Sequence, residues 1–342
     1  LTPAGRAKLA GMQLAGNPFW RFARRREAVV LQALRALYLL LKDRDYFVHQ
    51  DKILIVDANT GRSMPDRSWE HGLHQLVEAK EGCPLSDTRE QLGRLTFQRF
   101  FRRYLRLGGM SGTAREVAGE LWSVYGLQVR RIPLNSPSRR RQLATRIFPS
   151  AHEKWAAVLD SVRDLQRRGR PILIGTGSIA ESELLSRYLE RSGIAHQVLN
   201  ARQDEEEAHI VAAAGKAGQI TVATNMAGRG TDIPLGPGVA ELGGLHVLAT
   251  YRNAARRVDR QLIGRCARQG DPGESMIFAS LDDDLIVKNI PESVRARLKI
   301  KWSSRTGGVL WEHLYQFAQW SAERRAGQQR KSVLRMDDWL EE

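Results

Sequence analysis

Residues 222–273 read VATNMAGRGTDIPLGPGVAELGGLHVLATYRNAARRVDRQLIGRCARQGDPG, and this stretch decides the fold. It opens with an apolar run typical of a buried parallel strand, which ends in the glycine-rich turn AGRGTD. Gly228 and Gly230 allow backbone conformations that hold Arg229 and Asp232 at the carboxyl edge of that strand. Ligands bind at this edge in open α/β sheets, so we expect the turn to contact a ligand.

A helix carrying paired arginines follows the second strand of this stretch. The strand GLHVLAT leads into RRVDRQLIGRCARQ, where Arg265 and Arg268 are three residues apart and share one helix face. Two guanidinium groups on one face can hold the oxygens of a phosphate in transfer. A solvated basic helix is the alternative reading of the helix alone. Its spacing from AGRGTD, and the DPG that ends it, favour a phosphate site.

These segments resemble the second ATPase lobe of superfamily 2 helicase-like motors, and within them the SecA preprotein translocase ATPases. ATNMAGRGTDI is similar to motif V of that family and QLIGRCARQGDPG to its motif VI, while ELGGLHV and QGDPG are more SecA-like than helicase-like. Three upstream segments resemble SecA landmarks in the same order: IVDANTGR (55–62), GLHQLVEAKEG (72–82) and LTFQRFFRRYLRLGGMSGTA (95–114). The resemblance runs from about residue 40 to the end of the chain.

The resemblance implies a role for each motif residue. Arg265 and Arg268 would act as arginine fingers on the γ-phosphate of ATP, and Asp232 would contact the ribose. The nucleotide-binding set would be completed by Arg229, which supports the cleft, and by Gly228, Gly230 and Gln261.

GMSGTA corresponds to helicase motif III, a turn that relays the nucleotide state between lobes. Its candidate residues are Ser111, Gly112 and Thr113. The alternative for the two hydroxyls is a helix cap ahead of Glu116, and the two roles can coexist.

The sequence departs from the family pattern beside these motifs. The departures are Tyr251 where an acid is common, Ile263 where a basic residue is usual, and Cys266 and Ala267 where Ser and Gly are usual. Gln261, Gly264 and both arginines are intact. The pattern favours a divergent relative or paralogue, serving a specialised secretion route, over an inactive enzyme.

Two ATPase motifs are missing from the 342 residues. No GxxxxGKS or GxxxxGKT occurs, and no DExD-type cluster follows an apolar strand; the acidic runs at 204–207 and 282–284 fit a helix start and a loop. In the SecA family these motifs lie in a first lobe, N-terminal to everything seen here. Because the chain begins with Leu1, we expect a C-terminal piece of a longer protein. Mg²⁺ would be held by the absent lobe, and the chain alone should not hydrolyse ATP.

Alternating strands and helices after residue 150 predict an α/β fold: a RecA-like parallel sheet with flanking helical regions and a partial β-hairpin insertion. In the hairpin, DYFVHQDKILIVD, two short β-rich runs flank a polar turn. GTGSIAESE (175–183) is better explained as a helix cap than as a phosphate loop. We expect four parts, namely the end of a preprotein-binding insertion (1–60), the C-terminal part of a first nucleotide-binding lobe (61–134), a second RecA-like lobe (135–288) and the start of a helical scaffold (289–342).

The net charge indicates which classes of partner to expect, and the Cys, His and Glu positions indicate whether a metal site is expected. A formal net charge of +15 calls for an anionic partner. The arginines do not alternate with exposed aromatics, so anionic phospholipids come first and nucleic acid second. Cys83 and Cys266 lack metal or redox spacing. His74 and Glu78 share a helix face, but without a Cys or His partner nearby they fit a packed or solvated pair, and we expect no metal site.

The expected function is that of a SecA-type motor that couples ATP hydrolysis to preprotein translocation across the cytoplasmic membrane. The apolar stretch at 28–41 is too short to span a bilayer and contains Arg35. The resemblance implies a cytoplasmic protein at the inner face of the inner membrane, with preproteins, a SecYEG-type channel and anionic phospholipids as partners and a homodimer left open. The alternatives are a superfamily 2 nucleic-acid helicase lobe and a non-hydrolysing regulatory remnant.

Overall fold

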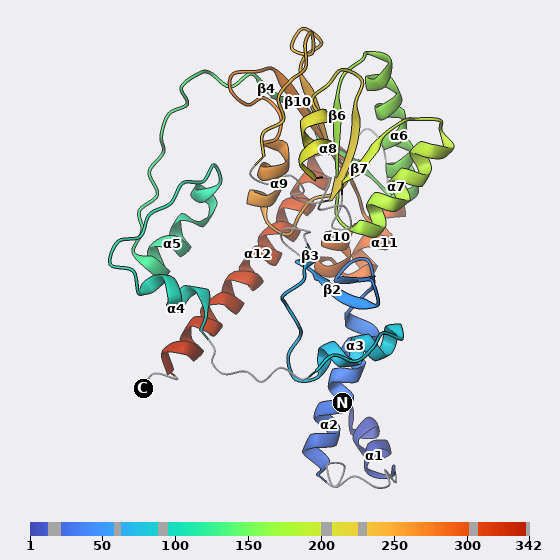
Figure 1. The fold of residues 1–342 in the computed structure, drawn as a ribbon, viewed down its shortest axis with the longest axis vertical. Helices are drawn as coiled ribbons and strands as arrows, with labels where there is room; N and C mark the ends of the chain where they lie inside the picture. Colours follow the sequence, from blue (N-terminus) through green and yellow to red (C-terminus); the bar gives the residue numbers. More distant parts are fainter. Residues whose placement is uncertain are drawn as a thin grey trace. The chain divides into compact units, whose positions relative to one another are not determined.

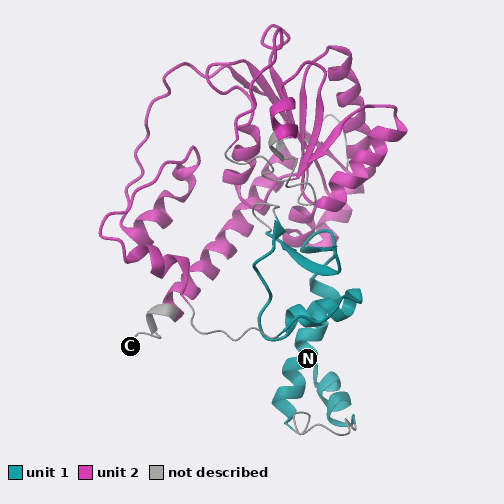
Figure 2. Cartoon of the chain, in the orientation of Figure 1, with its two compact units in different colours: residues 1–91 teal, residues 92–342 magenta. Residues whose placement is uncertain are grey.

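The computed structural model describes residues 1–12, 22–57, 63–87, 95–199, 207–224, 231–300 and 307–339. The chain divides into two compact units, residues 1–91 and 92–342 (Figure 2). In the described residues no helix is both long enough and apolar enough to cross a bilayer.

Unit 1 combines helices with a small antiparallel sheet (Figure 1). Its elements are α1 (Pro3–Ala10), α2 (Ala23–Leu34), the π-helical η2 (Arg35–Leu39), β1 (Tyr46–His49), β2 (Lys52–Val56), β3 (Ser63–Met64) and α3 (Leu73–Glu81). β1 and β2 pair through a two-residue turn at Gln50 and Asp51, whose φ values of 49° and 57° suit a tight hairpin. The expected hairpin is confirmed, and Tyr46, Ile53 and Val77 form its core against α3.

Unit 2 is built on a parallel sheet. Its described strands are β4 (Arg140–Gln142), β5 (Arg146–Phe148), β6 (Ile172–Thr176), β7 (Gln197–Leu199), β8 (Ile220–Thr224), β9 (Leu245–Ala249) and β10 (Gly273–Ser280). They form a seven-stranded sheet in the order β4-β10-β9-β6-β8-β7, with β5 also on β10, and each recorded pair is parallel. The α/β fold predicted from the alternation is confirmed.

Helices cover both faces of this sheet (Figure 1). Ile172 and Ile174 of β6 pack with α6 (Ala151–Arg167) and α7 (Ile179–Arg191), whereas Leu173 between them packs with α8 (Glu207–Ala213) and α9 (Arg256–Ile263). Successive strand side chains point to opposite faces, so burial on both sides explains the continuous apolar runs. Ser178 Oγ accepts a hydrogen bond from Glu181 N at the start of α7, which confirms the cap expected in GTGSIAESE.

Further helices precede and follow the sheet in the chain. α4 (Phe97–Arg102), the 3₁₀ turn η3 (Ala114–Val117) and α5 (Ala118–Tyr125) precede it, and α10 (Asp284–Asn289), α11 (Glu292–Ile300) and α12 (Gly307–Trp339) follow. In the acidic run 282–284, the first two residues lie in a turn, as expected, and α10 begins at Asp284. Asp283 pairs with buried Lys154 at 2.7 Å, so this carboxylate holds α6 to the end of β10.

The double glycine before β9 has a steric reason. Gly243 and Gly244 have φ values of 97° and 73°, and Arg170 donates to both of their carbonyl groups. A Cβ on Gly244 would lie 1.9 Å from the carbonyl oxygen of Pro272, a distance no side chain can tolerate. This close approach is what lets β9 and β10 start side by side.

We predict that Gly244→Ala lowers the free energy of unfolding by several kcal/mol or prevents folding. The matched control is Gly218→Ala, because Gly218 has the similar φ of 71° but nothing within 4 Å of an added Cβ. The control should lower the free energy of unfolding only by the cost of placing alanine in the left-handed region, about 1–2 kcal/mol. In Gly244→Ala the overlap with the backbone should lower it by roughly another 1–3 kcal/mol. Urea unfolding measures both, and equal losses would contradict the steric account.

Candidate functional site

Arg265 and Arg268 converge on the segment that follows β8. Arg265 Nη1 and Arg268 Nη1 each donate to the carbonyl oxygen of Thr231 at 3.1 Å, and Arg268 Nη1 also lies 3.0 Å from Asp232 Oδ1. The sheet topology is the cause, because β8 and β9 flank β6 and their carboxyl ends open at the same edge. The structure thus brings together Asp232, Arg265 and Arg268.

The two arginines differ in how freely they can move. Arg265 is buried, whereas the Arg268 side chain is 35% exposed and its partner Asp232 is 48% exposed. The hydrogen bond from Arg268 lowers the pKa of Asp232 below its ordinary value, so this carboxylate stays charged. An exposed ion pair of this kind contributes at most about 1 kcal/mol. Arg268 can therefore exchange Asp232 for a stronger anion at little cost.

The expected shared helix face of Arg265 and Arg268 is wrong: α9 ends at Ile263, and both arginines lie in the turn that follows it, where Ala267 has a φ of 55°. Gln261, in the last turn of α9, adds a polar atom nearby. Its Oε1 is buried and has no hydrogen-bond partner among the described residues. A buried acceptor in this state is costly, and a water, an ion or a functional role would account for it. The other predicted residues of the set, Gly228, Arg229 and Gly230, lie outside the described residues.

The segment at 111–113 is hydrogen-bonded to α9. Ser111 Oγ lies 3.1 Å from Thr113 Oγ1, and the carbonyl oxygen of Gly112 accepts a hydrogen bond of 3.0 Å from Arg260 Nη2. Arg260 also forms an ion pair with Glu116. Sequence reasoning did not identify Arg260 as a site residue, because nothing local signals a contact across 148 positions.

The helix-cap alternative for this segment is wrong. Thr113 stands at the N-cap of η3, yet its side chain makes no capping hydrogen bond. Glu116, the expected reciprocal partner, is drawn to Arg260 instead. Burial raises the pKa of Glu116, but the Arg260 hydrogen bond outweighs it and holds the pKa below its ordinary value.

A buried carboxylate anchors the other end of α9. Asp259 Oδ1 accepts hydrogen bonds of 2.8 Å from both Asn253 N and Nδ2, and Oδ2 accepts one of 2.7 Å from Gln319 Nε2 of α12. Burial nevertheless raises the pKa of Asp259 to about 6. The helix that precedes Arg265 is therefore tied to α12 through this side chain.

The departures from the family pattern lie in packing positions. Ile263 and Cys266 are buried in the core between α9 and the sheet, and burial raises the pKa of the Cys266 thiol. The Tyr251 ring lies where a Cβ on Gly177 would meet it at 3.4 Å. Ala267 has a φ of 55°, in the left-handed region that favours glycine.

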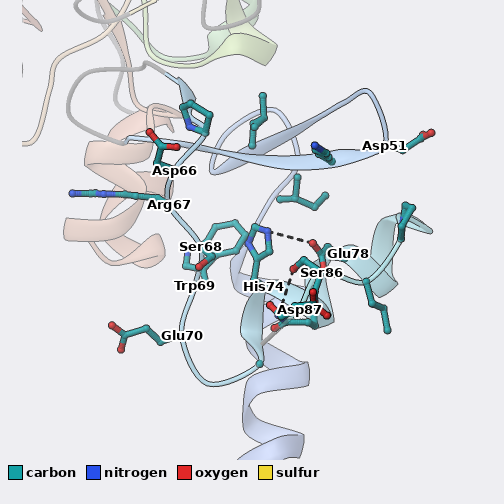
Figure 3. Close-up of a pocket in the computed structure, with 18 of the residues that line it drawn as sticks. Asp51, Asp66, Arg67, Ser68, Trp69, Glu70, His74, Glu78, Ser86 and Asp87 are labelled. Carbon is teal, nitrogen blue, oxygen red and sulfur yellow. Dashed lines mark hydrogen bonds and ion pairs between the residues drawn. The ribbon is translucent and has the colours of Figure 1, made fainter. Parts of the chain in front are cut away.

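Unit 1 has a cavity of its own, of about 930 Å³, between the β1–β2 turn, α3 and residues 84–87 (Figure 3). At its wall, His74 Nε2 lies 3.4 Å from Glu78 Oε1, and Glu78 Oε2 accepts hydrogen bonds from Ser86 N and Oγ. Both side chains of the His–Glu pair are buried. Of the two alternatives, a packed or a solvated pair, the structure shows the packed one. The described residues hold no cluster of three or more Cys, His, Asp or Glu side chains that could bind a metal.

We predict that Ala267→Gly raises the free energy of unfolding by about 0.5–1 kcal/mol. Glycine removes the left-handed strain, which costs an alanine about 1–2 kcal/mol, and this outweighs the added entropy of the unfolded chain. The matched control is Ala156→Gly, at an exposed position inside α6, which should lose about 1 kcal/mol. Chemical denaturation would show opposite signs, and a loss in both variants would contradict the prediction.

We predict that Asp259→Asn removes a pH-dependent part of the stability. Because the pKa of Asp259 is raised to about 6 in the folded chain, protonation of this group contributes to the free energy of unfolding. The contribution is fully present below pH 3.8 and is lost as the pH rises through 6. Between pH 5 and 7.5, the free energy of unfolding of the wild-type chain should therefore fall by about 1 kcal/mol relative to that of the variant. Urea unfolding at both pH values tests this, and a constant difference between the two proteins would refute it.

Two family descriptions match the chain: the SecA P-loop domain at residues 137–239 and 236–302, and the SecA preprotein cross-linking domain at residues 1–78. Protein translocase subunit SecA 2 of Nitrosospira multiformis is 49% identical over 99% of this chain and 51% of its own length. SecA 3 of Magnetococcus marinus is 47% identical over 98% of this chain and 52% of its own length.

The chain thus spans about half the length of these relatives. Among solved structures, the yeast DEAD-box splicing factor Prp28 aligns at 19% identity over 61% of this chain and 44% of that chain, with a TM-score of 0.38, too weak a likeness to bear on function. The two SecA domain matches and the relatives that align over nearly the whole chain agree, and the chain belongs to the SecA family of protein translocase subunits.

Proposed function

We propose that this chain supplies the second nucleotide-binding half of a SecA-type motor, in which ATP hydrolysis drives preproteins across the cytoplasmic membrane. One observation carries the proposal: two arginines in the turn after α9 meet the segment after β8 at the carboxyl edge of the sheet. The match to the SecA P-loop domain over the same residues supports nucleotide as the ligand.

The residues present fit a triphosphate. Arg268 is partly exposed in a weak ion pair, and the buried Gln261 Oε1 has no partner among the described residues. Bound ATP would supply a γ-phosphate whose oxygens carry the charge of the transfer step. Arg265, aligned by the Thr231 carbonyl group, and Arg268, released from Asp232, would donate to those oxygens.

Two further roles complete this set. Asp232, freed from Arg268, would accept a hydrogen bond from a ribose hydroxyl. Arg229, Gly228 and Gly230 would shape the turn that precedes it, as the family motif implies.

We assign Mg²⁺ to a first nucleotide-binding lobe. The 342 residues contain no GxxxxGKS or GxxxxGKT motif. In the proposal a separate lobe contributes the phosphate loop and the carboxylates for the metal, and this chain alone does not turn over ATP.

Arg260 gives the motor a route from the nucleotide to the coupling segment. It lies on α9, one turn before the C-cap residue Gly264, and contacts both Gly112 and Glu116. A shift of α9 when Arg268 changes partners would therefore move the segment Ser111–Thr113. This is the relay that motif III performs in the resembling motors, and closure of such lobes is how they do mechanical work.

The partners follow from the same family. The match of residues 1–78 to the preprotein cross-linking domain supports preproteins as substrates. We extend the proposal to a SecYEG-type channel and to anionic phospholipids at the inner face of the membrane, for which the net charge of +15 is suited. A homodimer and the four-part division at residues 60, 134 and 288 also remain proposals.

The test is a chimera in which this chain replaces the matching residues of the Nitrosospira multiformis protein. The chimera should hydrolyse ATP, and preprotein should stimulate it. Arg268→Ala should lower kcat on the order of 10³-fold, because an arginine finger acts on the transition state. Arg187→Ala, at an exposed site on α7, is the matched control and should change kcat less than about twofold.

A loss below about tenfold for Arg268→Ala would rule out the finger role. Stimulation by RNA and not by preprotein would favour the helicase alternative. A chimera without ATP turnover would favour the regulatory remnant.

A further inference from the structure

The N-terminus of α9 has no side-chain cap from its own N-cap residue. α9 starts at Arg256, and the N-cap residue Ala255 has no side chain that could accept a hydrogen bond. Its first two residues, Arg256 and Arg257, place positive charge at the end of the helix where the backbone dipole is already positive. An uncapped helix of eight residues with this charge pattern is weak by itself.

α12 supplies what α9 lacks. Glu323 Oε1 accepts a hydrogen bond of 2.8 Å from the backbone N–H of Arg256, so a carboxylate from another helix occupies the capping position. A carboxylate at this end also offsets the helix dipole. The cap of α9 thus comes from a residue 67 positions away in the chain.

The same face of α12 fixes the loop that enters α9. Gln319, which is 1% exposed, donates from Nε2 to the carbonyl oxygen of Asn253 at 2.9 Å and to Asp259 Oδ2 at 2.7 Å. Glu312 pairs with Arg252 at 2.6 Å. Glu312, Gln319 and Glu323 are spaced by seven and four residues, so they lie along one side of α12.

We propose that Gln319 and Glu323 are positioning residues for Arg265 and Arg268, so that α12 sets where the two arginines stand. The arginines lie in the turn directly after α9 and are hydrogen-bonded to its last residues: Arg265 N donates to the carbonyl oxygen of Leu262 at 3.0 Å, and Arg268 Nε donates to that of Gly264 at 2.9 Å. A displacement of α12 would therefore be delivered to Thr231 and Asp232 through α9. The role of the arginines rests on the proposed function, whereas the mechanical link does not.

Hydrogen–deuterium exchange on the full chain, without nucleotide, tests the link. Glu323→Ala should speed exchange about fivefold at the amides of 256–259, and also at the hydrogen-bonded amides of Gly264 and Arg265 at the far end of α9. Glu323→Gln keeps an acceptor oxygen and should restore most of the protection. Gln319→Leu should act in the same direction as Glu323→Ala, and if it does not fold, Glu323→Ala still decides the matter.

The matched control is Arg325→Ala, which breaks a contact of the same helix with Asn289 of α10 and should leave α9 unchanged. Faster exchange at 256–259 with no change at 264–265 would overturn the proposal, as would an equal effect of Arg325→Ala. If Glu323 only stabilised the fold as a whole, Glu323→Ala and Arg325→Ala should change the exchange rates of the α9 amides alike.

A double-mutant cycle in the chimera tests the consequence for turnover. If Glu323 acts through Arg265 and Arg268, Glu323→Ala should lower kcat several-fold with an unchanged KM for ATP, and its effect should be smaller in the Arg268→Ala background. Additive losses would overturn the positioning role. If the chimera has no turnover at all, the proposed function fails, and the exchange experiment still decides the link between α12 and α9.

Discussion

Two guanidinium groups share one neutral acceptor, the carbonyl oxygen of Thr231, and most of the features described around the site keep that arrangement in place. Bringing two cations to one point is unfavourable, so it has to be stabilised by the surrounding fold. The parallel sheet does this by ending β8 and β9 at the same edge. Such preorganised positive charge is what a transferring phosphate requires, because no reorganisation is then needed when negative charge develops.

α9 can serve this purpose because it is held from several directions. Leu262 and Ile263 pack it against the sheet, Arg260 ties it to the coupling segment, and Asp259 ties it to α12. The first contact is apolar and permits small sliding, whereas the other two are polar and break or form as a unit. An element restrained in this way is suited to pass a displacement from one end to the other.

The sequence could predict the sheet, but not the ties between distant elements. Alternating apolar runs and glycine turns are local signals, and they led to the strands and to the Ser178 cap. The family resemblance assigned Asp232 and Arg268 to one nucleotide site, but not to the ion pair that they form. The contacts of Arg260 with Gly112 and of Gln319 with Asp259 join exposed-looking polar residues far apart in the chain, for which no local pattern exists. The predicted cap at Thr113 failed for the same reason, since Glu116 found a stronger partner outside its own turn.

The positions at which this sequence departs from the family pattern have a structural explanation. Ile263 and Cys266 are apolar or weakly polar side chains in the core beneath α9, whereas Arg265 and Arg268 at the proposed phosphate site are those the family pattern expects. The departures therefore concern the packing of α9 and of the turn after it, and the two arginines are kept. Ala267 accepts backbone strain directly between the two arginines, and its methyl group approaches the position where a Cβ on Gly273 would stand, at 3.2 Å. This turn is consequently a place where the divergent sequence gives up local stability while the arginine geometry is kept, a trade that is typical of functional sites.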